Sequence, residues 1–103
     1  MQKYKLKMTT IAEKDLREIT EYITNVLENK IAADNFLNEF EKLVKERLYN
    51  PISFQKYQSN KNRKTVYYKL LVKNYTVFYI VKNDVMKVKR ILYSKRNFEK
   101  IIL

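Results

Sequence analysis

The chain has 103 residues and a formal net charge of +11, and it contains no histidine, cysteine or glycine. Its length predicts one domain spanning residues 1–103, and a hydrophobic share of 46% is typical of a folded globular protein. The missing cysteine and histidine exclude disulfides, thiolate catalysis and the common zinc sites, so we expect no metal and no cofactor. The missing glycine excludes the phosphate-binding loops of P-loop and dinucleotide-binding enzymes.

The positive charge is confined to one half of the sequence. Residues 1–51 hold nine Lys/Arg and nine Asp/Glu, whereas residues 52–103 hold thirteen Lys/Arg against two acidic residues. This segregation predicts a polyanionic partner, either a nucleic acid or an acidic protein, and the plainer alternative is a basic surface that only keeps the chain in solution. No apolar run is long enough to span a membrane, and the N-terminus does not look like a signal peptide, so we expect a cytoplasmic protein.

The first half of the sequence predicts a strand followed by a helix. Residues Lys3–Met8 alternate lysine with apolar residues, which is typical of a half-buried strand. Thr10 and Glu13 then have the spacing of a capping box, in which the threonine caps the helix and the glutamate reaches back to it. Apolar residues recur at intervals of four and three as far as Val26, which predicts one amphipathic helix ending at about Leu27.

A second apolar stripe begins at Ala33 and predicts a second helix. We expect it to end near Tyr49, because Pro51 disfavours helical geometry at the residue before it. Only a few polar residues separate the two helices, so they should form an antiparallel hairpin. Both stripes are interpreted as core packing against a sheet.

The second half of the sequence predicts a three-stranded antiparallel meander. Its runs are Thr65–Val72, Tyr75–Val81 and Val85–Tyr93, each rich in β-branched and aromatic residues and separated by short polar turns. The middle run is apolar on both faces, so helices should cover one face and another segment the other. Arg90 falls on the apolar side of the last run and needs a partner or a cleft, and the tail Phe98–Leu103 should pack or dock. The element order defines an α+β fold with an N-terminal strand, a helical hairpin, a meander and a short C-terminal tail.

Four segments carry more specific patterns: Ala12-Glu13-Lys14-Asp15-Leu16, Leu48-Tyr49-Asn50-Pro51, Val72-Lys73-Asn74-Tyr75-Thr76-Val77-Phe78-Tyr79 and Arg90-Ile91-Leu92-Tyr93-Ser94-Lys95-Arg96-Asn97. In their order and spacing they resemble the RelE/ParE superfamily of bacterial type II toxins, and the ending resembles its ParE-like branch more closely. The resemblance covers essentially the whole chain.

The resemblance implies a toxin that arrests bacterial growth unless a small, acidic and partly disordered antitoxin binds it. ParE-like members poison DNA gyrase, whereas RelE-like members cleave mRNA on the ribosome. Two cations of the RelE-like pattern are replaced here, by Leu71 and by Thr76. We therefore expect a ParE-like gyrase poison, with a RelE-type endoribonuclease as the first alternative and a non-toxic basic nucleic-acid-binding module as the second. Whether the chain is an enzyme stays open.

The candidate site residues are those that the resemblance and the chemistry of RNA cleavage together imply. RNA cleavage needs groups that transfer protons and cations that stabilise a charged phosphorane, which for this chain are lysine, tyrosine and arginine. If the chain is a nuclease, the catalytic residues are Lys69, Tyr93 and Arg96, although Lys69 could equally be a solvent-facing strand residue and Tyr93 an aromatic at the sheet edge. Phosphate or target binding is assigned to Arg63, Lys64, Arg90 and Lys95, and the antitoxin or polyanion face to Lys87, Lys89 and Tyr75.

Overall fold

The computed structural model describes residues 3–57, 65–98 and 101, and it confirms the predicted α+β fold. The chain forms a strand, two helices with a π-helical turn between them, and three further strands. In order, these are β1 (Lys5–Met8), α1 (Thr10–Glu21), the π-helical turn η1 (Tyr22–Val26), α2 (Lys30–Arg47), β2 (Tyr68–Val72), β3 (Tyr75–Lys82) and β4 (Val85–Tyr93).

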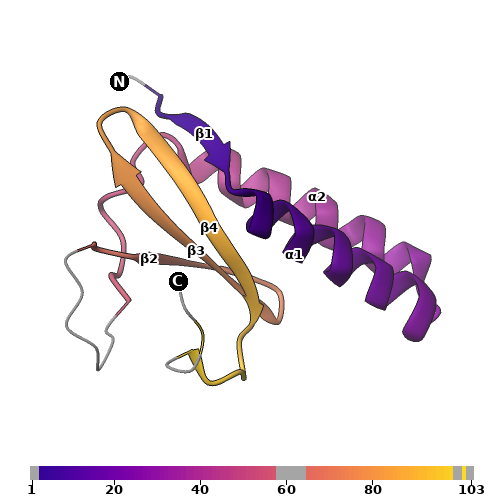
Figure 1. Ribbon diagram of the computed structural model, residues 1–103. Coiled ribbons are helices and arrows are strands. Elements are labelled where there is room, and N and C mark those ends of the chain that lie inside the picture. Colours follow the sequence, from indigo (N-terminus) through magenta and orange to yellow (C-terminus); the bar gives the residue numbers. More distant parts are fainter. Residues whose placement is uncertain (1–2, 58–64, 99–100, 102–103) are drawn as a thin grey trace.

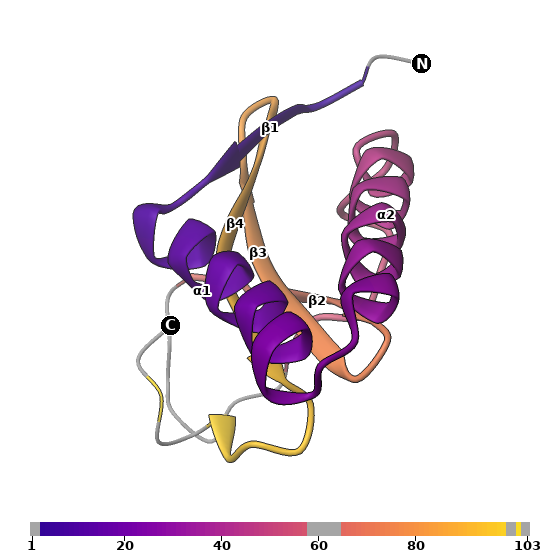
Figure 2. The same cartoon turned by 90° about the vertical axis from the view of Figure 1, so that its right-hand side faces the viewer.

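The four strands form one sheet with the order β1-β4-β3-β2. β2, β3 and β4 are the predicted antiparallel meander, whereas β1 joins at the edge and runs parallel to β4 (Figure 1). The two helices run in opposite directions on the same side of the sheet (Figure 2). None of the helices in the described residues is long and apolar enough to cross a membrane.

The first helix begins one residue earlier than the capping box predicted. Its N-cap is Thr9, not Thr10, and the Thr9 hydroxyl accepts a hydrogen bond from the Ala12 amide at 3.0 Å. The same hydroxyl donates to the Lys89 carbonyl at 3.0 Å, and the Thr9 amide donates to the Val88 carbonyl at 3.0 Å. Thr9 therefore ends the pairing of β1 with β4 and caps α1 at once, a role that Thr10 could not fill one position further on.

The other boundaries shift by a few residues. α1 ends at Glu21 and continues as a π-helical turn from Tyr22 to Val26, capped by Leu27. The segment predicted as one helix therefore has α-helical hydrogen bonds in its first part and π-helical ones in its last turn. α2 ends at Arg47 rather than near Tyr49. β1 is shorter than predicted, and so is β2, whose pairing with β3 begins at Tyr68 opposite Tyr79.

The sheet has an apolar cluster on each face, as the middle strand predicted. The larger cluster lies between the sheet and the helices and includes Phe36, Val77 and Tyr79. On the other face, Tyr67, Phe78 and Leu92 form a smaller cluster against which Tyr57, Ile80, Phe98 and Ile101 pack. The predicted packing of the tail is confirmed for its two described residues, Phe98 and Ile101.

Tyr79 fixes the loop that follows α2. Its hydroxyl donates to the Pro51 carbonyl at 2.7 Å and accepts from the Arg47 guanidinium at 2.8 Å. The same guanidinium lies 3.5 Å from the centroid of the Phe54 ring, in a cation–π contact. These contacts attach the loop between α2 and β2 to Tyr79 of β3 and to Arg47 at the end of α2, and they hold β2 beside α2.

Candidate functional site, an aromatic groove between the helical hairpin and the sheet

A concave surface lies where the helical hairpin meets one end of the sheet. It is a groove of about 730 Å³. Its walls come from η1, the first turns of α2, the turn between β2 and β3, and the last residue of β4. The lining residues are Tyr22, Ile23, Leu27, Ala32, Asn35, Phe36, Lys73, Asn74, Tyr75 and Tyr93. The surface is thus mainly apolar and aromatic, with one cation and two amides at its rim.

A row of aromatic rings forms the floor of this aromatic groove. Phe36 of α2 meets the Tyr75 ring edge-on at a centroid distance of 5.2 Å, and Tyr75 meets Tyr93 edge-on at 5.7 Å. Tyr75 and Tyr93 are direct partners across β3 and β4, so the sheet register places them together. Burial raises the pKa of Tyr75 above its ordinary value, and the neighbouring Tyr22 and Tyr93 hydroxyls raise it further. At neutral pH Tyr75 is a hydrogen-bond donor and not a base.

A smaller pocket of about 160 Å³ continues from this floor along β4. It shares Tyr75 and Tyr93 with the aromatic groove, and its lining also includes Arg96 and, from α1, Asp15 and Glu18. Arg96 follows the end of β4 in a tight turn, in which its amide donates to the Tyr93 carbonyl at 3.0 Å. Three of the predicted site residues, Tyr75, Tyr93 and Arg96, are thus brought together.

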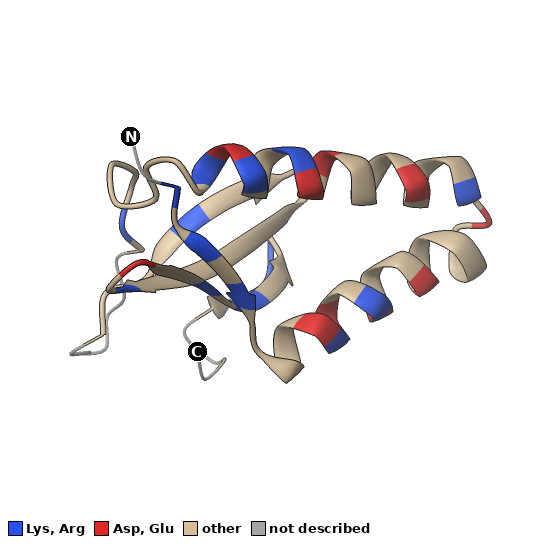
Figure 3. Ribbon diagram, turned by 90° about the horizontal axis from the view of Figure 1, so that it is seen from above, with Lys and Arg blue, Asp and Glu red and all other residues tan. Residues whose placement is uncertain are grey.

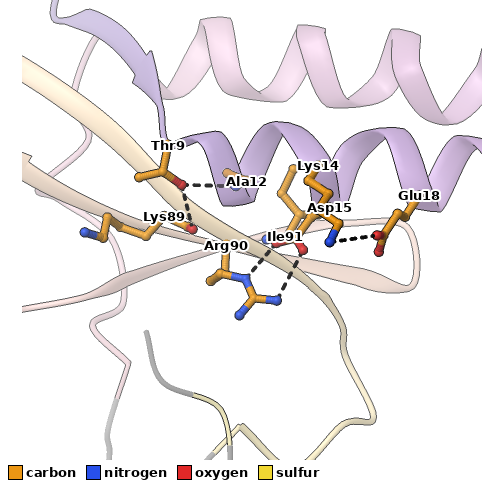
Figure 4. A network of polar contacts seen from close by, with 8 residues as sticks. All are labelled: Thr9, Ala12, Lys14, Asp15, Glu18, Lys89, Arg90 and Ile91. Atoms are coloured by element: carbon orange, nitrogen blue, oxygen red, sulfur yellow. Dashed lines mark hydrogen bonds and ion pairs between the residues drawn. The ribbon is translucent and has the colours of Figure 1, made fainter.

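Arg90 has the partner that the sequence required. Its guanidinium donates to Asp15 of α1 through Nε at 2.8 Å and through Nη2 at 3.2 Å (Figure 4). The same carboxylate accepts from the Ile91 amide at 2.9 Å. Side-chain exposure is only 20% for Arg90 and 10% for Asp15. This ion pair competes with the phosphate- or target-binding role predicted for Arg90, because two of its donors are already used.

Lys69 does not join Tyr93 and Arg96. It pairs with Phe78, whose ring belongs to the small cluster on the face away from the helices. Cross-strand partners share a face, so Lys69 points away from the helices whereas Tyr93 lies on the helical side with Tyr75. The three residues assigned to nuclease catalysis therefore do not converge in this structure.

The two positions that depart from the RelE-like pattern carry no charge and have ordinary structural surroundings. Thr76 is 2% exposed, and its hydroxyl is 2.8 Å from the Ser94 hydroxyl. Leu71 is 64% exposed on β2, at an edge of the sheet. Neither residue supplies the positive charge that a cleaved phosphate would need.

The remaining predicted residues lie elsewhere. Lys87 and Lys89 are half-buried in β4, in the part of the strand nearer to β1, and Lys95 is exposed in the turn after β4. Arg63 and Lys64 lie outside the described residues. Within the described part of the chain, no three acidic side chains come close enough to hold a metal ion.

Sequence reasoning missed two features of this region. Tyr22 was left out of the site, although it lies beside Ile23 of the apolar stripe and is exposed. Asp15 was not singled out either, yet it lies three residues after Ala12 and four before Ile19, on the buried side of α1. A carboxylate at that position is a readable signal for a buried ion pair.

Comparison with known proteins agrees with this fold. Residues 6–98 match the family described as the ParE toxin of the type II toxin-antitoxin system parDE. Because the match covers nearly the whole chain, the protein belongs to the ParE toxin family of type II toxin-antitoxin systems. No curated protein sequence matches the chain significantly.

Solved structures share the fold at low sequence identity. A chain of the chromosomal ParDE toxin-antitoxin system from P. aeruginosa is 18% identical with a TM-score of 0.71, over 89% of this chain and 97% of that one. The archaeal RelE–RelB complex from Pyrococcus horikoshii contains a chain that is 16% identical with a TM-score of 0.62, over 93% and 100%. The E. coli DinJ–YafQ complex contains one that is 11% identical with a TM-score of 0.52, over 89% and 93%. Chains from ParDE, RelE–RelB and DinJ–YafQ systems thus share this architecture.

Proposed function

We propose that this toxin arrests growth by binding DNA gyrase in the cytoplasm, and that it does not cleave RNA. The observation that carries the proposal is the separation of Lys69 from Tyr93 and Arg96 across the sheet. Cleavage through a phosphorane needs its proton-transfer group and its cations around one phosphate. With Leu71 and Thr76 uncharged, such a cluster is incomplete among the described residues, whereas a binding mechanism does not need it.

We propose further that the cognate antitoxin silences the toxin by filling the aromatic groove. An amphipathic segment could place apolar side chains against Phe36, Tyr75 and Tyr93, as helix-in-groove recognition does elsewhere. Acidic residues on that segment would then meet Lys73 at the rim and Arg96 in the adjoining pocket. The structural relatives crystallised as ParDE, RelE–RelB and DinJ–YafQ systems support an antitoxin partner of this kind.

The target is tested by inducing the toxin in bacteria without antitoxin and measuring which process fails first. Gyrase poisoning predicts loss of negative supercoiling, a DNA-damage response and, with purified gyrase, accumulation of cleaved DNA. The mRNA on translating ribosomes should still be intact when growth stops. Codon-positioned mRNA cuts that precede any change in supercoiling would instead establish the endoribonuclease. Growth that continues unchanged would favour the non-toxic module.

A pair of variants sharpens the same experiment. Lys69→Ala should leave growth arrest unchanged, because Lys69 faces away from the groove and has no catalytic role in a binding mechanism. Arg96→Ala should weaken arrest if the end of β4 contacts the target. The endoribonuclease alternative is favoured by one observation, that Tyr93 and Arg96 line the same pocket, and it predicts that both variants lose activity together.

The antitoxin assignment has its own test. Ala32→Arg places a long cation in the aromatic groove and should reduce binding to the co-expressed antitoxin by at least about tenfold, since a charge would be buried in an apolar interface. Asn38→Arg is the matched control on an exposed side of α2, outside the groove lining. Equal binding by both variants would place the antitoxin elsewhere.

A further inference from the structure

A second surface, far from the aromatic groove, carries lysines that the proposed function does not use. On the side of the sheet away from the helices, four lysines project from three neighbouring strands. Their strand neighbours Met8, Val81 and Met86 pack into the helical core, and side chains alternate between faces. We call the four residues the lysine patch: Lys5 and Lys7 of β1, Lys82 of β3 and Lys87 of β4.

The charge of the lysine patch is scarcely compensated. Lys7 lies directly opposite Lys87 in the β1–β4 register, and like charges in that position repel. β1, β3 and β4 contain no acidic residue. Figure 3 shows that the Asp and Glu residues, in red, lie on the helices and in turns. Asp84, in the turn after β3, lies 3.6 Å from the Lys5 ammonium, but both side chains are more than half exposed, so the pair is weak.

We propose that the lysine patch binds the phosphate backbone of a nucleic acid without reading its sequence. A repulsive pair such as Lys7 and Lys87 is stabilised when a polyanion lies across it, because the anion removes the repulsion and releases its own counterions. Duplex DNA carries a charge about every 1.7 Å of its axis, denser than one carboxylate per residue, about 3.3 Å, in an extended peptide. The charge density therefore favours phosphate over an acidic protein segment.

The chemistry of the side chains also indicates backbone contact. All four members of the patch are lysines, which act as point charges on flexible stems rather than as planar forks. β1 and β3 contain no asparagine, glutamine or arginine that could pair with a base edge, and the Arg90 guanidinium of β4 already donates to Asp15. Contacts of this type position a protein on a nucleic acid and carry no sequence information.

The lysine patch and the aromatic groove occupy opposite ends of the meander. Tyr75 begins β3 at the groove and Lys82 ends it at the patch, which corresponds to about 23 Å along the strand. A nucleic acid on the patch would not need to displace a partner from the groove. The inference therefore goes beyond the proposed function, and it does not depend on whether gyrase or the ribosome is the target.

The test is a titration of the purified full-length chain with a fluorescent DNA duplex of about 20 base pairs and arbitrary sequence, followed by anisotropy at several salt concentrations. Four phosphate contacts predict that the logarithm of the association constant falls with a slope of about −3.6 against the logarithm of salt concentration. Between roughly 50 and 200 mM salt, affinity should therefore fall by about 100-fold. An unrelated duplex sequence should bind equally well.

Two double variants carry the same change in net charge. Lys7→Gln with Lys87→Gln should reduce the slope by about 1.8, whereas Lys42→Gln with Lys45→Gln, on the exposed side of α2, should leave it unchanged. The patch variant should also melt at a higher temperature in low salt, because it loses a repulsive pair, and this reports that it is folded. Equal loss by both variants, absence of DNA binding at low salt, or patch-dependent binding of polyglutamate without binding of DNA would each overturn the proposal.

Discussion

Asp15 of α1 and Arg90 of β4 form a two-pronged ion pair across 75 positions of the sequence. The pair lies where β1 has ended and β4 has lost its strand neighbour. There, the Asp15 carboxylate accepts a hydrogen bond from the Ile91 amide, and the Thr9 hydroxyl donates one to the Lys89 carbonyl (Figure 4). The start of α1 thus takes over the hydrogen bonding of a missing strand, which fixes the end of β4 that carries Tyr93.

Removing the Asp15 carboxylate should be costly. Asp15→Ala leaves the Arg90 guanidinium without its counter-ion and the Ile91 amide without an acceptor, so we expect the free energy of unfolding to fall by about 2–3 kcal/mol. Asp15→Asn keeps a neutral acceptor and should cost less. Urea denaturation of both variants measures the difference, with Glu21→Ala on the exposed side of α1 as control. A loss below about 0.5 kcal/mol for Asp15→Ala would show that water replaces the pair.

The chain occupies left-handed backbone positions without a single glycine. Glu28, Lys73 and Asn83 have φ angles of 51°, 55° and 57°, and Lys73 and Asn83 are the first residues of the two-residue turns in the meander. Glu28→Gly and Lys73→Gly should each stabilise the fold by about 0.5–1 kcal/mol, because a side chain at Cβ disfavours this conformation. Asn83→Gly should gain less, since asparagine tolerates it.

Thermal unfolding measures these three changes. The matched control is Lys82→Gly, which places glycine in β3 at an ordinary extended position and should lower the melting temperature. If Glu28→Gly and Lys73→Gly also lower the melting temperature, the side chains of Glu28 and Lys73 stabilise the fold through their contacts by more than the left-handed backbone conformation costs.

Two tyrosines, the half-buried Tyr75 and the buried Tyr79, predict a loss of stability at alkaline pH. Burial raises the pKa of both Tyr75 and Tyr79 above 10.0, with Arg47 opposing the shift at Tyr79. Between 10.0 and the raised values, the folded chain holds protons that the unfolded chain has lost, so stability falls as pH rises through this window. Tyr75→Phe should make the decline shallower, whereas Tyr49→Phe, at an exposed position, should not. Urea midpoints measured from pH 8 to 11 test this.

Phe98 connects the tail to the face of the sheet away from the helices. Its ring meets Phe78 edge-on at 4.8 Å and Tyr57 at 6.0 Å. Phe98→Ala should lower the free energy of unfolding by about 2 kcal/mol and expose the small cluster to hydrophobic dyes, while Phe98→Leu should retain most of the stability. Unchanged dye binding in Phe98→Ala would mean that the cluster is covered without the tail.

The element types were predictable because they depend on local patterns. The spacing of apolar residues identified both helices, and alternation with short turns identified the meander. The boundary at Thr9 was missed because the choice between two adjacent threonines depends on a hydrogen bond to Val88, almost eighty residues away. The π-helical turn at Tyr22 was likewise invisible, because the apolar spacing of the sequence continues to Val26, whereas in the structure Val26 is 65% exposed and no longer belongs to the buried stripe.

The sequence alone determined that two helices and a basic meander form this domain, that Arg90 needs a partner, and that the middle strand is covered on both faces. Only the tertiary structure decided that β1 lies parallel to β4, that Asp15 is the partner, and that Tyr93 and Arg96 converge while Lys69 turns away. Periodicity reports the direction of each side chain relative to its own element. Which elements become neighbours depends on long-range pairing, and that pairing created the Asp15–Arg90 bridge, the aromatic groove and the lysine patch.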